Sequence, residues 1–150
     1  MAAHGDRVSE VVAGARPVGR FRPAQRVRTH ADHEAVKEVA RRVTTPSLVL
    51  LLRSRALEGE ARLGIVATRR LGSAPVRNRA KRLVREAFRS TRELWSQGMD
   101  LVVIVRRPPS GATLDSFVAE LMGARPAIER ATRRAVTDLA ARTGNAEASP

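Results

Sequence analysis

The chain has 150 residues and a formal net charge of +13, with a sequence pI near 11.8, which suits one domain with tails and favours a nucleic-acid partner over acidic small molecules. A membrane surface is the competing polyanion, but the longest apolar runs, 48–52 and 101–105, are far too short to span a bilayer. The absence of cysteine excludes disulfides and thiolate metal sites, and the N-terminus has no cationic start with an apolar core, so we expect a cytoplasmic protein.

The N-terminal part is expected to be an arm followed by one helix. Residues 1–19 show no sustained hydrophobic period and are expected to be disordered. The basic stretch 20–28 is either a solvated tail or an arm that contacts phosphates. Residues 30–42 are expected to form the first helix, with acidic residues in its first turn.

Two apolar strands follow this helix. Residues 48–57 and 63–70 are predicted strands, and the segment 57–60 contains a glycine that suits a turn between them. We expect the two strands to pair as an antiparallel hairpin. Both are apolar at successive positions, which indicates that both faces of the sheet are at least partly covered.

A cationic helix comes next in the chain. Ser73 is a plausible N-cap, Pro75 suits the first helical turn, and the helix is expected to run to about Trp95 before Gly98 stops it. On a helical wheel one arc is apolar. The opposite arc carries Asn78, Lys81, Arg82, Arg85, Arg89 and Arg92.

This cationic arc conflicts with ordinary helix design. Like charges at i,i+4 cost about 0.2–0.5 kcal/mol per pair, and a face that is merely solvated would alternate the signs of its charges. Only one acid, Glu86, stands among nine basic residues between Arg69 and Arg92. We therefore interpret the arc as a surface for a polyanion, most simply a nucleic acid.

The C-terminal part adds one strand and an interrupted helix. Residues 101–107 form the predicted third strand, Thr113 caps a last helix, and Gly123 to Pro126 interrupt it before 128–141 resume it. The result is an α+β fold of order α-β-β-α-β-α with helices packed on one small mixed sheet. The expected division is a disordered arm (1–19), one nucleic-acid-binding domain (20–141) and a disordered tail (142–150).

The sequence shows no catalytic constellation. It lacks cysteine and tyrosine, and it contains no nucleophile elbow, no HExxH motif and no glycine-rich phosphate loop. Asp100 could serve as a general base but more simply ends the turn before the third strand. His30 and His33 flank Asp32 without a third ligand nearby, so no metal site is expected in the protein.

The run VRNRAKRLVREAFR, preceded by GIVATRRLG and followed by DLVVIVRR, resembles the protein subunit of bacterial ribonuclease P. The hallmark of that family is a helix with the pattern RNRxKRxxRE, matched here by 77–79, 81–82 and 85–86. The resemblance covers about residues 20 to 122. It implies a left-handed crossover around the cationic helix, where the general rule for β-α-β units would suggest a right-handed one.

In this family an RNA subunit is the catalyst. The resemblance therefore implies an accessory subunit of a ribonucleoprotein endoribonuclease, inactive alone, that binds the catalytic RNA and precursor tRNA and assists removal of the 5′ leader. Mg²⁺ would be held mainly by the RNA. The residues carried over as RNA-binding are Arg77, Asn78, Arg79, Lys81, Arg82 and Arg85 on the helix and Thr68, Arg69 and Arg70 after the second strand, to which the cationic arc adds Arg89.

The resemblance also implies a groove for the leader between the first helix and the sheet. The family usually places aromatic residues there, whereas this chain has His33, Lys37 and Leu51 at those positions. We expect the groove to rely on charge instead of base stacking, with Arg53 among the residues that supply it.

Two other functions stay open on the sequence alone. One is a non-catalytic structural RNA-binding protein of the ribosomal-protein type. The other is a basic DNA-binding protein, although no helix-turn-helix or dimer seam supports it. No membrane and no obligate protein partner are expected, and a test for faster tRNA maturation by cognate catalytic RNA at low Mg²⁺ separates the three functions.

Overall fold

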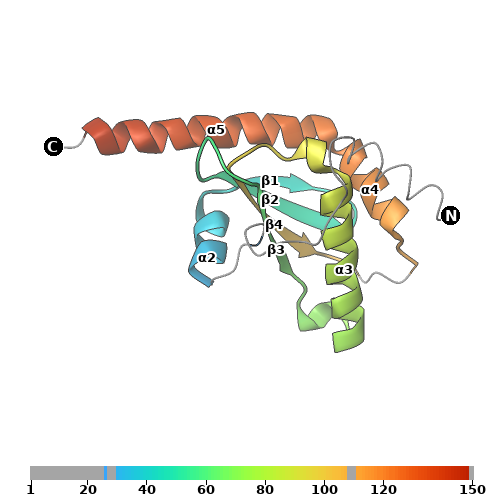
Figure 1. Cartoon of the computed structure of the whole chain (residues 1–150). Coiled ribbons are helices and arrows are strands. Elements are labelled where there is room, and N and C mark those ends of the chain that lie inside the picture. Colours follow the sequence, from blue (N-terminus) through green and yellow to red (C-terminus); the bar gives the residue numbers. More distant parts are fainter. Residues whose placement is uncertain (1–25, 27–29, 108–110, 149–150) are drawn as a thin grey trace.

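The structure is a computed structural model that describes residues 26, 30–107 and 111–148. Its main elements, drawn in Figure 1, are α2 (His30–Val39), β1 (Arg41–Thr44), β2 (Leu48–Ser54), β3 (Arg62–Val66), α3 (Ala74–Ser90), β4 (Met99–Val105), α4 (Leu114–Gly123) and α5 (Arg125–Ala148). The prediction of one α+β domain with a small mixed sheet is confirmed. The predicted arm, 1–19, lies outside the described residues.

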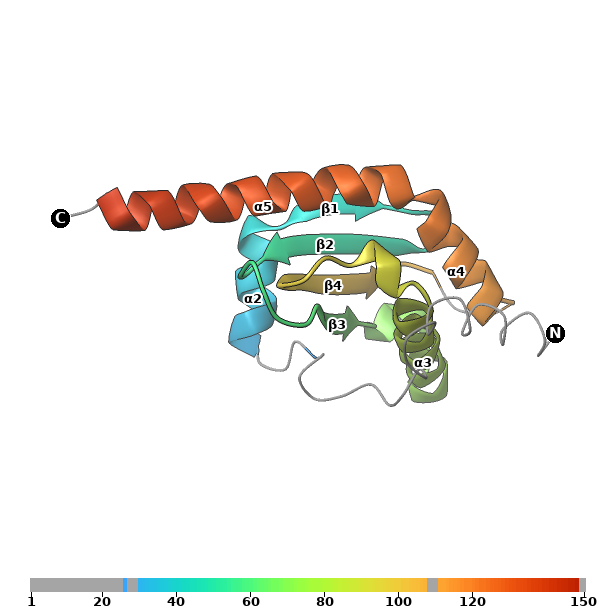
Figure 2. The ribbon, with the colours of Figure 1, turned by 45° about the horizontal axis from the view of Figure 1, so that its top comes forward.

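The four strands have the order β1-β2-β4-β3 (Figure 2). β4 is antiparallel to β2, with Leu50 opposite Val103, and parallel to β3, with Ile65 opposite Val103. The predicted hairpin between the second and third of these strands in the chain is therefore wrong, because β4 lies between them. β4 is buried along its length and forms ladders on both sides, so it lies inside the sheet between β2 and β3. The left-handed crossover through α3 stays a prediction.

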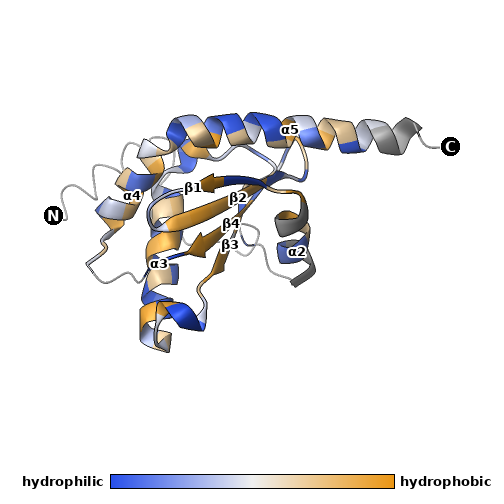
Figure 3. Ribbon diagram, turned by 180° about the vertical axis from the view of Figure 1, so that it is seen from behind, coloured by the Kyte–Doolittle hydropathy of each residue, from blue (hydrophilic) through white to orange (hydrophobic). Residues whose placement is uncertain are grey.

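The two faces of the sheet carry different layers. On one face Leu50, Leu101 and Val103 form the main core with buried residues of α3, α4 and α5. On the other face Leu51 and Val102 pack against Val36 of α2 in a smaller cluster. β2 and β4 are accordingly apolar along most of their length (Figure 3), as the sequence indicated for buried strands, whereas β1 begins with two exposed arginines.

The first helix is shorter than expected, and a strand replaces its end. α2 stops at Val39, and Arg41 and Arg42, which were assigned to the helix, belong to β1. β1 pairs antiparallel with β2, and Val43 buries its side chain in the main core. The β-branched Val43 and Thr44 favour a strand, and the pairing with β2 stabilises it at the expense of one further helical turn.

The cationic helix is confirmed, with a shorter C-terminal end. Ser73 is the N-cap of α3 and Pro75 lies in the first turn, but α3 ends at Ser90 and a 3-10 turn, η3 (Arg92–Leu94), follows it. Trp95 stacks on Phe88 with ring centroids 5.6 Å apart. Gly98 has a φ of 73° and a Cβ there would lie 1.9 Å from the carbonyl oxygen of Ala56, so only glycine fits this turn into β4.

The C-terminal helices follow the predicted break but extend further. Thr113 caps α4 in a reciprocal capping box with Ser116, and the helix breaks at Ala124. α5 then runs to Ala148, so the segment expected to be a disordered tail from residue 142 is helical up to that residue. Arg142 donates a hydrogen bond of 2.8 Å from Nη2 to the carbonyl oxygen of Ser54, which fastens α5 to the end of β2.

This contact changes what truncation is expected to do. A chain that ends after Thr143 retains Arg142 and should unfold with nearly the wild-type midpoint. A chain that ends after Ala141 leaves the Ser54 carbonyl without its charged donor and should lose about 1 kcal/mol of unfolding free energy. Urea denaturation of the two chains provides the measurement, and equal midpoints would show that the contact is not stabilising.

Candidate nucleic-acid interface

α3 presents its charged side chains outward because its apolar side is committed to the core. Ala80, Val84, Ala87 and Phe88 are buried against the sheet and α4. Of the predicted RNA-binding residues, Asn78, Arg79 and Arg82 are exposed, whereas Arg77, Lys81, Arg85 and Arg89 are partly buried. The helical period thus produces a cationic surface about 25 Å long at 1.5 Å per residue, as the wheel predicts.

A short turn extends this surface before α3 begins. The 3-10 turn η2 (Arg69–Leu71) follows the end of β3, and its Leu71 is buried in the main core. This anchor leaves Thr68, Arg69 and Arg70 exposed. The amide groups in the first turn of α3 follow closely, and the dipole of a helix favours an anion at that end.

Like charges crowd the middle of the surface. The pKa of Arg85 is held below its ordinary value, first by burial and then by the nearby cations Arg26 and Arg82. Arg26 also forms a parallel bridge with Leu63, which places one residue of the basic stretch 20–28 beside α3. Cations brought together against their own repulsion characterise a surface that binds a polyanion.

Two of the arginines have contacts within the protein. Arg89 forms an ion pair of 2.5 Å with Glu86, one turn before it on the same helix. Arg79 donates a hydrogen bond of 2.8 Å to the carbonyl oxygen of Ala112, which links α3 to the segment before α4. Lys81, Arg82 and Arg85 therefore form the central part of the surface that we call the α3 surface, with Asn78, Arg69 and Arg70 at its N-terminal end.

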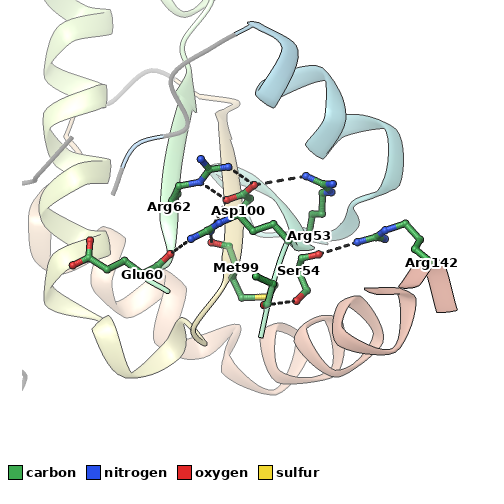
Figure 4. A network of polar contacts seen from close by, with 9 residues as sticks. Arg53, Ser54, Glu60, Arg62, Met99, Asp100 and Arg142 are labelled. Carbon is green, nitrogen blue, oxygen red and sulfur yellow. Dashed lines mark hydrogen bonds and ion pairs between the residues drawn. The ribbon is translucent and has the colours of Figure 1, made fainter. Parts of the chain in front are cut away.

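The opposite face of the sheet holds a polar network that the sequence did not reveal (Figure 4). Asp100 is fully buried in β4, not in a turn. Arg62 of β3 binds its carboxylate through two hydrogen bonds of 2.8 Å, and Arg55 donates a third of 2.8 Å. Arg53 approaches to 3.8 Å. The three arginines outnumber the single carboxylate, so this region remains cationic.

The residues expected in the leader groove are only partly brought together. Leu51 and Arg53 lie two residues apart on β2, hence on the same face, and α2 packs on that face. Leu51 is 8% exposed and so forms the floor beneath α2 rather than an open contact surface. His33 is partly buried on α2, and the side chain of Lys37 lies outside the described part of the chain.

Sequence reasoning missed one exposed cation on this face. Arg42 pairs with Leu51 in the β1–β2 ladder and therefore projects on the side of α2. It was assigned to the end of the first helix and was not among the residues expected in the groove. The strand-favouring residues directly after it were the available signal.

The side chains of the α3 surface are chemically suited to binding phosphate. Within the described ranges, no group of three His, Asp or Glu residues is placed to hold a metal ion. Among the helices that the structure describes, none is both long and apolar enough to cross a membrane. The arginines offer forked donors that match phosphate oxygens.

Comparison with known proteins gives one consistent result. The family model described as Ribonuclease P matches residues 21–137. A protein of Gluconacetobacter diazotrophicus named Ribonuclease P protein component is 38% identical over 99 residues, covering 65% of this chain and 85% of the relative. One of the same name from Desulfovibrio desulfuricans is 35% identical over 111 residues, covering 72% of this chain and 83% of the relative.

Solved structures agree with these relatives. The RNase P protein of Thermotoga maritima superimposes with a TM-score of 0.58 at 30% identity, covering 65% of this chain and 92% of the other. The Staphylococcus aureus RNase P protein gives a TM-score of 0.59 at 27% identity, covering 67% and 91%.

Proposed function

Since the chain belongs to the ribonuclease P protein family, we propose that it binds the catalytic RNA subunit of ribonuclease P through the α3 surface. In this role it assists removal of the 5′ leader from precursor tRNA. The observation that carries the proposal is the unbalanced charge of α3. Its apolar side is fixed in the core, and the RNR pattern at 77–79 opens the helix with arginines at the end where the dipole disfavours cations. A phosphate backbone would compensate this arrangement.

We place the Mg²⁺ of the reaction on the RNA. The described residues offer no group of carboxylates or imidazoles for a hard cation, and the α3 surface repels cations. RNA phosphate oxygens supply the ligands that Mg²⁺ prefers. The role of the protein is then to neutralise phosphate charge so that RNA segments approach each other, which matters most when divalent ions are scarce.

The test is cleavage of precursor tRNA by cognate catalytic RNA at low Mg²⁺. Adding the full chain should accelerate release of the 5′ leader, while the chain freed rigorously of RNA should cleave nothing. Metal-dependent cleavage by RNA-free protein would contradict the accessory role. Binding to the RNA without any acceleration would indicate a structural RNA-binding protein instead.

We further propose that the leader lies across the face of the sheet beside α2 and is held mainly by charge. Base stacking on an aromatic ring contributes about 1–3 kcal/mol per base, and this chain lacks the aromatic residues usual there. The nearby cations are Arg42, Arg53 and Arg62.

Replacing His33 and Lys37 with Phe should add stacking and remove one charge. Leader-dependent affinity should then rise at high salt, and its dependence on salt should become shallower. The measurement is the affinity for precursor tRNA with and without a leader over a salt series. Weaker leader binding by the double variant at every salt concentration would show that α2 does not line the leader path.

A further inference from the structure

A cationic hollow lies at the β1 edge of the sheet, and it is separate from the α3 surface. It has a volume of about 430 Å³ and is formed by the β1 region on one side and α5 on the other. Its cationic side chains are Arg41 of β1 and Arg130 and Arg134 of α5, and no acidic residue lines it. Arg42 borders the hollow, but its side chain projects from β1 on the side of α2.

The hollow follows from the sequence of α5. Ala127 and Ala131 are four residues apart, so they lie on the same side of the helix, and their small side chains leave open space toward β1. Arg130 and Arg134 have the same spacing and flank that space. The alanines of α5 thus form the base of the hollow, and its arginines form the sides.

A smaller hollow of about 310 Å³ continues the surface along α5. Arg41 and Arg134 line both hollows, and Arg133 joins them in the second. The one acid is Asp138, which accepts two hydrogen bonds of 2.8 Å from Arg41. Four arginines, Arg41, Arg130, Arg133 and Arg134, therefore share one carboxylate. Within the described residues, Arg130, Arg133 and Arg134 have no ion pair.

The chemistry of this surface fits a phosphate backbone. Guanidinium groups bind phosphate oxygens as forks. No aromatic residue lines either hollow, so bases would have no stacking partner and the contact would read no sequence. A membrane would need apolar anchors, yet the exposed large hydrophobic residues among those described are Val39 and Leu57, and neither lines the hollow.

The position of the hollow separates it from the α3 surface. α5 packs on β1 and the neighbouring β2, and α3 packs on β3; β1 and β3 are the two outer strands of the sheet (Figure 2). Four strands at about 4.8 Å spacing place the two edges about 14 Å apart. The phosphates that would lie along α3 are therefore not the phosphates that would lie in the hollow.

We propose that the hollow between β1 and α5 is a second phosphate-binding site, which holds a segment of RNA backbone distinct from the segment on the α3 surface. The proposal rests on the proposed function, because it takes the catalytic RNA as the partner. It makes this chain a clamp with two separated contacts on one RNA.

The test compares full-length variants for binding to the catalytic RNA over a salt series. Changing Arg130 and Arg134 to Gln should reduce the slope of log affinity against log salt by about 1.4–1.8, since each lost phosphate contact lowers it by about 0.7–0.9. The variant Asp138→Asn, which releases Arg41, should steepen the slope. The matched control changes Arg107 and Arg125, exposed arginines outside the hollow, to Gln and should have a clearly smaller effect.

Footprinting of the RNA gives the second readout. Nucleotides that lose protection with the Arg130/Arg134 variant should differ from those lost when Lys81, Arg82 and Arg85 are changed to Gln. An unchanged slope, an effect equal to that of the control, or loss of the same nucleotides in both variants would overturn the second site. If instead only the change on α3 had no effect, the proposed function would fail at the α3 surface and the hollow would remain the RNA contact.

Discussion

Replacing Asp100 with Asn is expected to lower the free energy of unfolding by about 3 kcal/mol, a large part of the 5–15 kcal/mol typical of a domain. Asp100 is fully buried and accepts two hydrogen bonds from Arg62 and one from Arg55. An amide keeps one acceptor oxygen and turns an NH₂ group toward the guanidinium donors. The partly buried arginines would then repel one another without a compensating charge.

Urea denaturation followed by circular dichroism measures this loss. The matched control is Asp138→Asn, which removes the same charge from an ion pair with Arg41 at the surface and should change the midpoint little. If Asp100→Asn and Asp138→Asn shifted the midpoint equally, the buried network would not stabilise the sheet.

The second large effect is expected in RNA binding. Changing Lys81, Arg82 and Arg85 to Gln removes three charges from the α3 surface and should lower the slope of log affinity against log salt by about 2–2.7. The apolar face of α3 is untouched, so the thermal midpoint should stay close to that of the wild type. Arg89 is left in place because it pairs with Glu86.

A salt series with the catalytic RNA checks this prediction. The control variant with Gln at Arg107 and Arg125 loses two charges and gives the effect per charge of a general loss of positive charge, against which the three-charge variant is compared. A folded triple variant whose slope equals the wild-type slope would refute the α3 surface as the main RNA contact.

The elements that the sequence predicted well depend on neighbours in the chain. α3 was found because its apolar and basic residues alternate with the helical period, and the break before α5 was found because Gly123 and Pro126 disfavour a continuous helix. The strand order was not predictable in the same way. Whether β2 pairs with β3 or with β4 is decided by contacts between residues about 50 positions apart.

The same contrast between local and long-range contacts holds for the candidate site. The α3 surface could be predicted because its cations lie on successive turns of one helix. The Asp100 network could not be predicted in this way. Its arginines come from three places, namely β2 (Arg53), the loop that follows β2 (Arg55) and β3 (Arg62), and they meet only when β4 enters the sheet. The position of Arg42 on a strand was missed for a local reason, because a four-residue strand is too short to show an alternating pattern.

The central place of β4 also has a consequence for synthesis on the ribosome. β1 and β2 are close in the chain and can pair early, but β3 has its ladder with β4 alone among the strands of the sheet. At about 5–20 residues per second, the stretch from Val66 to Met99 takes seconds to emerge. During that interval the cationic residues of α3 are already exposed on a nascent chain without a finished core. Ribosomal RNA is then the nearest polyanion, and we expect closing of the sheet to compete with binding of that RNA by the cationic residues of α3.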